Sequence, residues 1–154
     1  MNIFDFSFED IDGNQVNLDK FSGKPILIVN TASRCGFTPQ YANLQNLFIN
    51  YKDTDLTIIA TTSNSFAQEY TNVEDIKKIC LVNYGVGFVT SAPMNVSGSK
   101  AHPIYAWIDE KYNKSPKWNF FKFLFDRKGD LVESWSSMTK PDSNKITKTI
   151  DNLI

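Results

Sequence analysis

Two short apolar runs with a helical pattern between them constrain the fold of this chain most strongly. Residues 25–29 (PILIV) and 56–60 (LTIIA) each have the length and apolar character of a buried strand. Between them, apolar residues recur at spacings of three and four, as on one face of a helix: Leu44, Leu47, Phe48 and Tyr51. Thr38 or a neighbour is expected to cap this helix, with Pro39 in its first turn. The order predicts a strand–helix–strand unit.

Weaker patterns flank this unit on both sides. Phe4, Phe6 and Phe8 alternate with polar residues before a turn at 12–14, which together with residues 16–18 predicts an N-terminal β-hairpin. Further along, we expect a helix over 73–82 capped by Asn72, a short extended segment at 86–89, a helix over 101–108, a hairpin of residues 121–125 and 131–135, and a last helix over 143–153. A βαβ unit followed by an antiparallel hairpin and a helix is the thioredoxin-like arrangement. We therefore expect an α/β fold with a central mixed β-sheet flanked by helices, and one domain over residues 1–154.

Composition and charge exclude several classes of function. Of the 154 residues, 42% are hydrophobic and 21% charged, which is typical of a globular protein. The net charge is −1 and the basic residues form no stripe, so no nucleic-acid partner is expected. No apolar run is long enough to span a membrane and no secretory signal is visible, so we expect a cytoplasmic protein. In that compartment two cysteines favour redox chemistry over a structural disulfide.

Cys35 is the strongest candidate for a reactive residue. It follows the first buried strand and precedes the helix, close to the positive end of the helix dipole and to unpaired backbone N–H groups, which favour the thiolate. The turn and the neighbouring Gly36 predict an exposed position for the thiol. Thr38 stands where thioredoxin has its second cysteine, so a local disulfide is impossible and Cys80 is the only other thiol.

Simpler interpretations compete with functional ones at other positions. Cys80 would lie on an apolar helical face, where it could be a small buried hydrophobe. Taken alone, Trp118 is typical of a core aromatic residue and Gln68 of a surface loop. His102 is expected in a loop or at a helix start, and two cysteines with one histidine lack metal-site spacing. We expect neither a metal nor another cofactor.

Three separated segments carry a resemblance to a known family. They are residues 30–41 (NTASRCGFTPQY), 95–105 and 117–124, which contains WNF followed by KFL. In this order they resemble the signatures of the glutathione peroxidase family. The resemblance implies a peroxidase that reduces hydroperoxides, with Cys35 as the peroxidatic residue surrounded by Gln68, Trp118 and Asn119. Amide and indole N–H groups can stabilise a thiolate and orient a peroxide for attack.

The resemblance is incomplete in the middle of the chain. Residues 61–69 (TTSNSFAQE) are one residue shorter than the family's middle signature, and Ser63 stands where the family usually has a cysteine. Residues 76–86 resemble the members that use a second, resolving cysteine, here Cys80, and that are generally reduced by thioredoxin rather than glutathione. Only nine residues separate Ile108 from Trp118, whereas tetrameric, glutathione-using members tend to have a longer insertion there. This implies a monomer with an open active-site face.

These features together predict a mechanism. Cys35 becomes a sulfenic acid, Cys80 resolves it to a disulfide, and thioredoxin or glutathione restores the thiols. A peroxide sensor that passes its disulfide to a client protein would use the same two cysteines and stays open as an alternative. A general disulfide exchanger is less consistent with Thr38.

Overall fold

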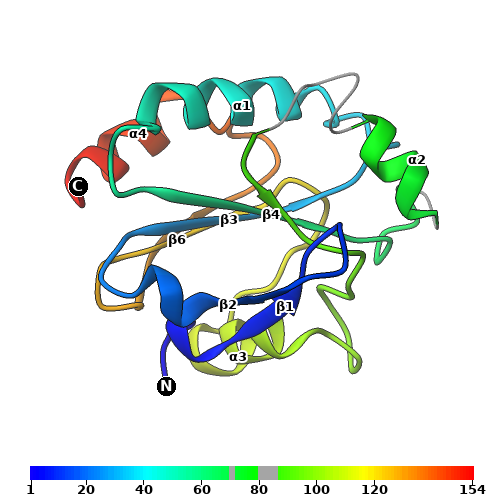
Figure 1. The fold of residues 1–154 in the computed structure, drawn as a ribbon, viewed down its shortest axis with the longest axis horizontal. Helices are drawn as coiled ribbons and strands as arrows, with labels where there is room; N and C mark the ends of the chain where they lie inside the picture. Colours follow the sequence, from blue (N-terminus) through cyan, green and yellow to red (C-terminus); the bar gives the residue numbers. More distant parts are fainter. Residues whose placement is uncertain (70–71, 80–86) are drawn as a thin grey trace.

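A five-stranded mixed sheet forms the centre of the protein in a computed structural model that describes residues 1–69, 72–79 and 87–154 (Figure 1). Its strand order is β5-β4-β3-β6-β7. The strands are β3 (Ile26–Thr31), β4 (Thr57–Thr62), β5 (Val89–Thr90), β6 (Lys122–Phe125) and β7 (Leu131–Trp135). β3, β4 and β5 are parallel, while β6 is antiparallel to both of its neighbours. The strand–helix–strand unit and the C-terminal hairpin are therefore confirmed.

The central strand explains why the apolar runs are continuous. All six residues of β3 are buried, because both faces of the sheet are covered. Leu27 and Val29 belong to the hydrophobic cluster on one face, and Ile26 and Ile28 to the cluster on the other, as the alternation of side chains along a strand requires.

Helices cover one face, and a helix with the N-terminal hairpin covers the other (Figure 1). The first layer contains α1 (Gln40–Tyr51) and α4 (Asn144–Asp151). The second contains α3 (Pro103–Tyr112) and the hairpin of β1 (Ser7–Glu9) and β2 (Gln15–Asn17). His102 caps α3, since its Nδ1 accepts the Ile104 N–H at 3.2 Å, which confirms the expected helix start.

The helix α2 (Val73–Lys77) begins where the sequence predicts. The Asn72 side chain accepts the Glu74 N–H at 2.8 Å and so caps the first turn. Ile76 anchors the helix in the cluster that includes α1. The continuation of the predicted helix, with Cys80, lies outside the described residues.

The first predicted strand is shorter than expected. Phe4 lies in a 3-10 helix, η1 (Ile3–Asp5), because Asn2 and Asp5 form a reciprocal capping box. The interpretation of Phe4 and Phe6 as strand residues is therefore wrong, since β1 begins only at Ser7 and Phe6 is the C-cap of η1. A second 3-10 helix, η2 (Leu18–Phe21), follows β2, so Leu18 does not belong to the strand.

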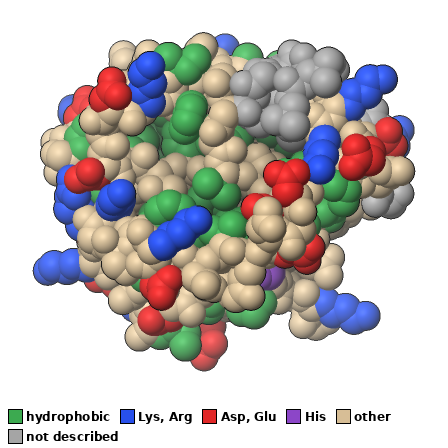
Figure 2. Space-filling model, in the orientation of Figure 1, with side chains coloured by type: hydrophobic (Ala, Val, Ile, Leu, Met, Phe, Trp, Pro, Cys, Tyr) green, Lys and Arg blue, Asp and Glu red, His purple; other side chains and the backbone are tan. Residues whose placement is uncertain are grey.

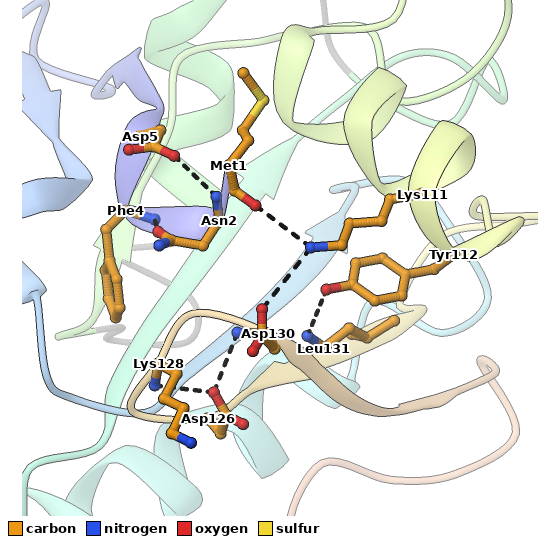
Figure 3. A network of polar contacts seen from close by, with 10 residues as sticks. All are labelled: Met1, Asn2, Phe4, Asp5, Lys111, Tyr112, Asp126, Lys128, Asp130 and Leu131. Carbon is orange, nitrogen blue, oxygen red and sulfur yellow. Dashed lines mark hydrogen bonds and ion pairs between the residues drawn. The ribbon is translucent and has the colours of Figure 1, made fainter.

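Polar contacts tie the N-terminal segment to the turn between β6 and β7 (Figure 3). The Ile3 N–H donates to the Gly129 carbonyl at 3.1 Å. Lys111 of α3 donates to the Met1 carbonyl at 3.4 Å and lies 3.8 Å from the Asp130 carboxylate. These bonds close the second layer on the far side of the sheet from α1.

The surface shows no separation of charge on the face drawn in Figure 2. Lysine, arginine and acidic side chains are interspersed there, with hydrophobic atoms showing between them. Within the described residues, none of the helices has the length and apolar character needed to cross a membrane.

Candidate active site

Cys35 lies in the turn between β3 and α1. The thiol is free, and the residue is only 7% exposed although Arg34 and Gly36 on either side are exposed. The expectation of an exposed thiol is therefore wrong. The Phe37 N–H donates to Sγ at 3.4 Å, so a backbone donor fixes the position of the sulfur. The helix itself begins only at Gln40.

Thr38 holds this turn closed instead of capping the helix. Its Oγ1 accepts the Cys35 N–H at 2.9 Å and donates to the Ala32 carbonyl at 2.8 Å. Its own N–H donates to the Cys35 carbonyl at 3.0 Å. The N-cap position belongs to Pro39, which makes no side-chain cap bond, so the predicted capping role of Thr38 is wrong. The threonine satisfies the backbone around the thiol.

The shortened loop reaches the Cys35 turn. The Gln68 carbonyl accepts the Arg34 N–H at 2.8 Å, and Glu69 Oε1 accepts the Ser33 N–H at 3.2 Å. Glu69 is 4% exposed, and its own N–H donates to the Asn64 side chain at 3.0 Å. The main chain at Gln68 is thus held beside the residue that precedes Cys35, despite the missing residue in the loop.

Trp118 and Asn119 lie in the turn that enters β6, and Asn30 of β3 holds this turn. The Asn30 amide donates to the Trp118 carbonyl at 2.9 Å and accepts the Phe121 N–H at 2.9 Å. The Asn30 carbonyl accepts a further bond from the Phe120 N–H. This function of Asn30 was not predicted from the sequence. The available signal was a polar residue at the end of a buried strand.

The Gln68 loop and the Trp118 turn are in contact with each other. The rings of Phe66 and Trp118 pack with centroids 5.5 Å apart. Trp118 is 36% exposed, so the alternative that it is a core aromatic residue is wrong. Three segments that are distant in the sequence are therefore linked in a row: residues 33–38, which contain Cys35, contact residues 64–69, and residues 64–69 contact the Trp118 turn.

Asn119 differs from its neighbours in having an unsatisfied side chain. The residue is fully buried, and neither its Nδ2 nor its Oδ1 has a hydrogen-bond partner in the part of the chain that the structure describes. A buried amide without a partner costs roughly 1–3 kcal/mol. Such an amide is available to donate to a bound molecule.

Both turns contain a residue in the left-handed backbone region. Ala67, directly before Gln68, has φ 56°, and Phe120, directly after Asn119, has φ 62°. Residues other than glycine adopt this conformation at a cost, and they do so preferentially at functional sites. The backbone at both predicted donors is therefore shaped by its tertiary contacts.

No metal site accompanies these residues. Across residues 1–69, 72–79 and 87–154, no group of three or more His, Cys, Asp or Glu side chains could hold a metal ion. Of the predicted site residues, the structure brings together the segments that carry Cys35, Gln68, Trp118 and Asn119. Cys80 lies outside the described residues.

Comparison with known proteins decides the family. The family model for glutathione peroxidase matches residues 3–109. The chain belongs to the glutathione peroxidase family. A glutathione peroxidase-like peroxiredoxin from Saccharomyces cerevisiae is 41% identical over 151 residues, covering 94% of this chain and 91% of the relative. The crystal structure of T. cruzi GPX1 has a TM-score of 0.78 at 32% identity and covers 99% of this chain and 96% of that one.

A more distant likeness confirms the predicted fold. A thiol:disulfide interchange protein of the thioredoxin family from Chlorobium tepidum has a TM-score of 0.67 at 14% identity, covering 94% of this chain and 92% of that one. At this identity the likeness concerns the fold alone. Family membership adds the activity: the protein is a thiol peroxidase acting on hydroperoxides, with a thioredoxin-like fold.

Proposed function

We propose that Cys35 is the peroxidatic residue and that Gln68, Trp118 and Asn119 assist it. The observation that carries this proposal is a series of contacts that links the Cys35 turn to the Gln68 loop and the Gln68 loop to the Trp118 turn. The Gln68 carbonyl is bonded to Arg34, and Trp118 packs on Phe66 of the same loop. Each of these side chains offers N–H donors that cannot act as competing bases.

The proposed first step is attack of the Cys35 thiolate on one peroxide oxygen. The sulfur–oxygen bond forms as the oxygen–oxygen bond breaks, and the departing oxygen takes a proton and leaves as water or an alcohol. Cys35 is thereby oxidised to a sulfenic acid. The unpaired, buried amide of Asn119 fits a donor that stabilises the developing negative charge on oxygen.

The proposed second step uses Cys80 as the resolving residue. Its thiol attacks the sulfenic sulfur and releases water, which leaves a Cys35–Cys80 disulfide. A dithiol reductant then reduces this disulfide and is itself oxidised. The step requires the two Cα atoms to approach within about 7 Å. The sequence predicts a helix that includes Cys80, and we expect this predicted helix to loosen during turnover.

Thioredoxin is the reductant that we propose, with glutathione as the alternative. The yeast relative is named a peroxiredoxin as well as glutathione peroxidase-like. The connection from α3, which ends at Tyr112, to the Trp118 turn is short. A short connection is consistent with a monomer whose site is open to a protein reductant. We further propose that the protein forms one domain and acts in the cytoplasm.

Turnover with each reductant tests this function. Peroxide consumption is measured with thioredoxin plus its reductase and, separately, with glutathione, for wild type, Cys80→Ser and Cys35→Ser. We expect fast thioredoxin-dependent turnover in wild type, a single round of reduction in Cys80→Ser, and none in Cys35→Ser. Unchanged steady-state turnover in Cys80→Ser would overturn the two-cysteine scheme. A stable mixed disulfide with one client protein, in place of turnover, would favour the sensor.

A further inference from the structure

A buried lysine lies at the start of β6. Lys122 is fully buried, and among the described residues its Nζ forms hydrogen bonds but no ion pair. It donates to Gln40 Oε1 at 2.7 Å and to the Ser136 carbonyl at 3.3 Å. Gln40 is the first residue of α1, where the positive end of the helix dipole opposes a cation. Burial and the helix dipole both disfavour the charged lysine here, and these two hydrogen bonds compensate only part of that cost.

The bonds of Lys122 continue to the turn that carries Asn119. The Gln40 amide donates to the Ser137 carbonyl at 2.6 Å, so Gln40 joins the lysine to residues 136–137. The Ser137 hydroxyl then donates to the Asn119 carbonyl at 2.5 Å. Lys122, Gln40, Ser137 and Asn119 are each at most 6% exposed, so the hydrogen bonds that join these four residues are shielded from solvent.

We propose that Lys122 is a positioning residue of the active site, acting through Gln40 and Ser137 on the main chain of Asn119. The inference rests on the proposed function of Asn119 as a donor. Asn30 holds Trp118 and Phe121 on either side of Asn119, while the Ser137 hydroxyl bonds Asn119 itself. Lys122 acts through Gln40 on the Ser137 main chain, and the Ser137 hydroxyl fixes Asn119 between the anchored residues Trp118 and Phe121. Misplacement by about 1 Å can lower a rate by about 100-fold.

The protonation state of Lys122 makes the network responsive to pH. Burial lowers the pKa of Lys122 to about 7. Its register partners are Val29 of β3 and Trp135 of β7, and its Nζ donates to Gln40 of α1 and to the Ser136 carbonyl; none of these four groups is ionisable. Loss of the proton removes the charge that strengthens both hydrogen bonds. Weaker hydrogen bonds of Lys122 should alter the position of the turn that contains Asn119 near neutral pH.

Amide NMR in a Cys35→Ser background tests the route without interference from the peroxidatic thiol. We expect the Asn119 and Trp118 amide resonances to titrate with a midpoint near pH 7, and this titration to disappear in Lys122→Met and in Ser137→Ala. The Thr149→Ala control removes an exposed helix hydroxyl that bonds only Lys145 and should leave the titration unchanged. Titration that persists in Ser137→Ala, or its absence in the parent protein, would overturn the proposal.

A rate measurement in the protein with Cys35 intact gives the second test. Oxidation of Cys35 by hydrogen peroxide in a single turnover should slow roughly five- to tenfold in Ser137→Ala, the effect of one lost hydrogen bond. Ser137→Ala removes only one hydroxyl, so it can be measured even if Lys122→Met does not fold. An unchanged rate in folded Ser137→Ala would contradict the positioning role. A wild type that consumes no peroxide would instead contradict the proposed function, while the NMR titration would still report on the network.

Discussion

Thr38 shows how one hydroxyl supports the reactive turn. It pairs with both the Cys35 N–H and the Ala32 carbonyl, groups that are buried with it. The sequence indicated only that Thr38 could not form a disulfide, because a threonine beside a helix start is equally typical of a cap. The hydrogen bonds of Thr38 join it to Cys35, three positions before it, and to Ala32, six positions before it. They form only when the chain turns between these residues, so the sequence alone does not predict them.

Replacing Thr38 by valine should destabilise the protein. Valine keeps the shape but leaves two buried backbone groups unpaired, so we expect the free energy of unfolding to fall by about 2–4 kcal/mol. Urea denaturation measures the loss. Thr38→Ser is the matched control, since it keeps the hydroxyl and should lose much less. Equal stability of the serine and valine variants would show that the hydroxyl contributes nothing.

Lys122 should make stability depend on pH in a definite direction. Burial lowers the pKa of Lys122 from 10.5 to about 7, so between these values the unfolded chain binds a proton that the folded chain lacks. The free energy of unfolding therefore rises with pH between about 7 and 10.5, by up to about 1.4 kcal/mol per pH unit. Below pH 7 Lys122 is charged in the folded protein too, so the full cost of burying its charge lowers the stability there.

The comparison of wild type with Lys122→Met isolates this contribution, because the other titrating groups are common to both proteins. Urea denaturation at pH 6, 7.5 and 9 measures the difference in stability. We expect the free energy of unfolding of wild type to increase relative to that of Lys122→Met as the pH rises above 7. A difference that stays constant from pH 6 to pH 9 would contradict the assignment.

At the scale of elements, the central strands were predictable and the turns were not. The runs at 25–29 and 56–60 became β3 and β4 because strands covered on both faces need continuous apolar sequence. The predicted strand at Phe4 was wrong because a capping box of neighbouring residues outweighed the alternation of phenylalanines. Alternation over so few residues is a weak signal when a local polar contact competes with it.

The left-handed residues Ala67 and Phe120 carry no sequence signal of their conformation. Alanine and phenylalanine are uncommon there, and only tertiary contacts of the two turns require it. The same limit applies to the site. Cys35 could be recognised from its place between strand and helix, whereas Gln68, Trp118 and Asn119 came from the resemblance, and the contacts of Asn30 and Lys122 were missed.

At the scale of the molecule, the sheet brings three distant segments to one place. β3 leads into the Cys35 turn, β4 leads into the Gln68 loop beside it, and the Trp118 turn enters β6 on the other side of β3. The parallel pairing of β3 and β4 puts their carboxyl ends at the same edge of the sheet. The thioredoxin-like fold thus places the segments of the proposed site at neighbouring strand ends, with the proposed donors of Gln68 and Trp118 in the connections of the two strands that flank β3.

The central claim is that Cys35 itself reacts with the peroxide. Reduced Cys80→Ser protein is mixed with one equivalent of hydrogen peroxide in the presence of dimedone, and its peptides are mapped by mass spectrometry. We predict close to one dimedone adduct per chain, on Cys35, and none in the Cys35→Ser, Cys80→Ser double variant. Consumption of the peroxide without an adduct or any oxidation at Cys35 would contradict the account.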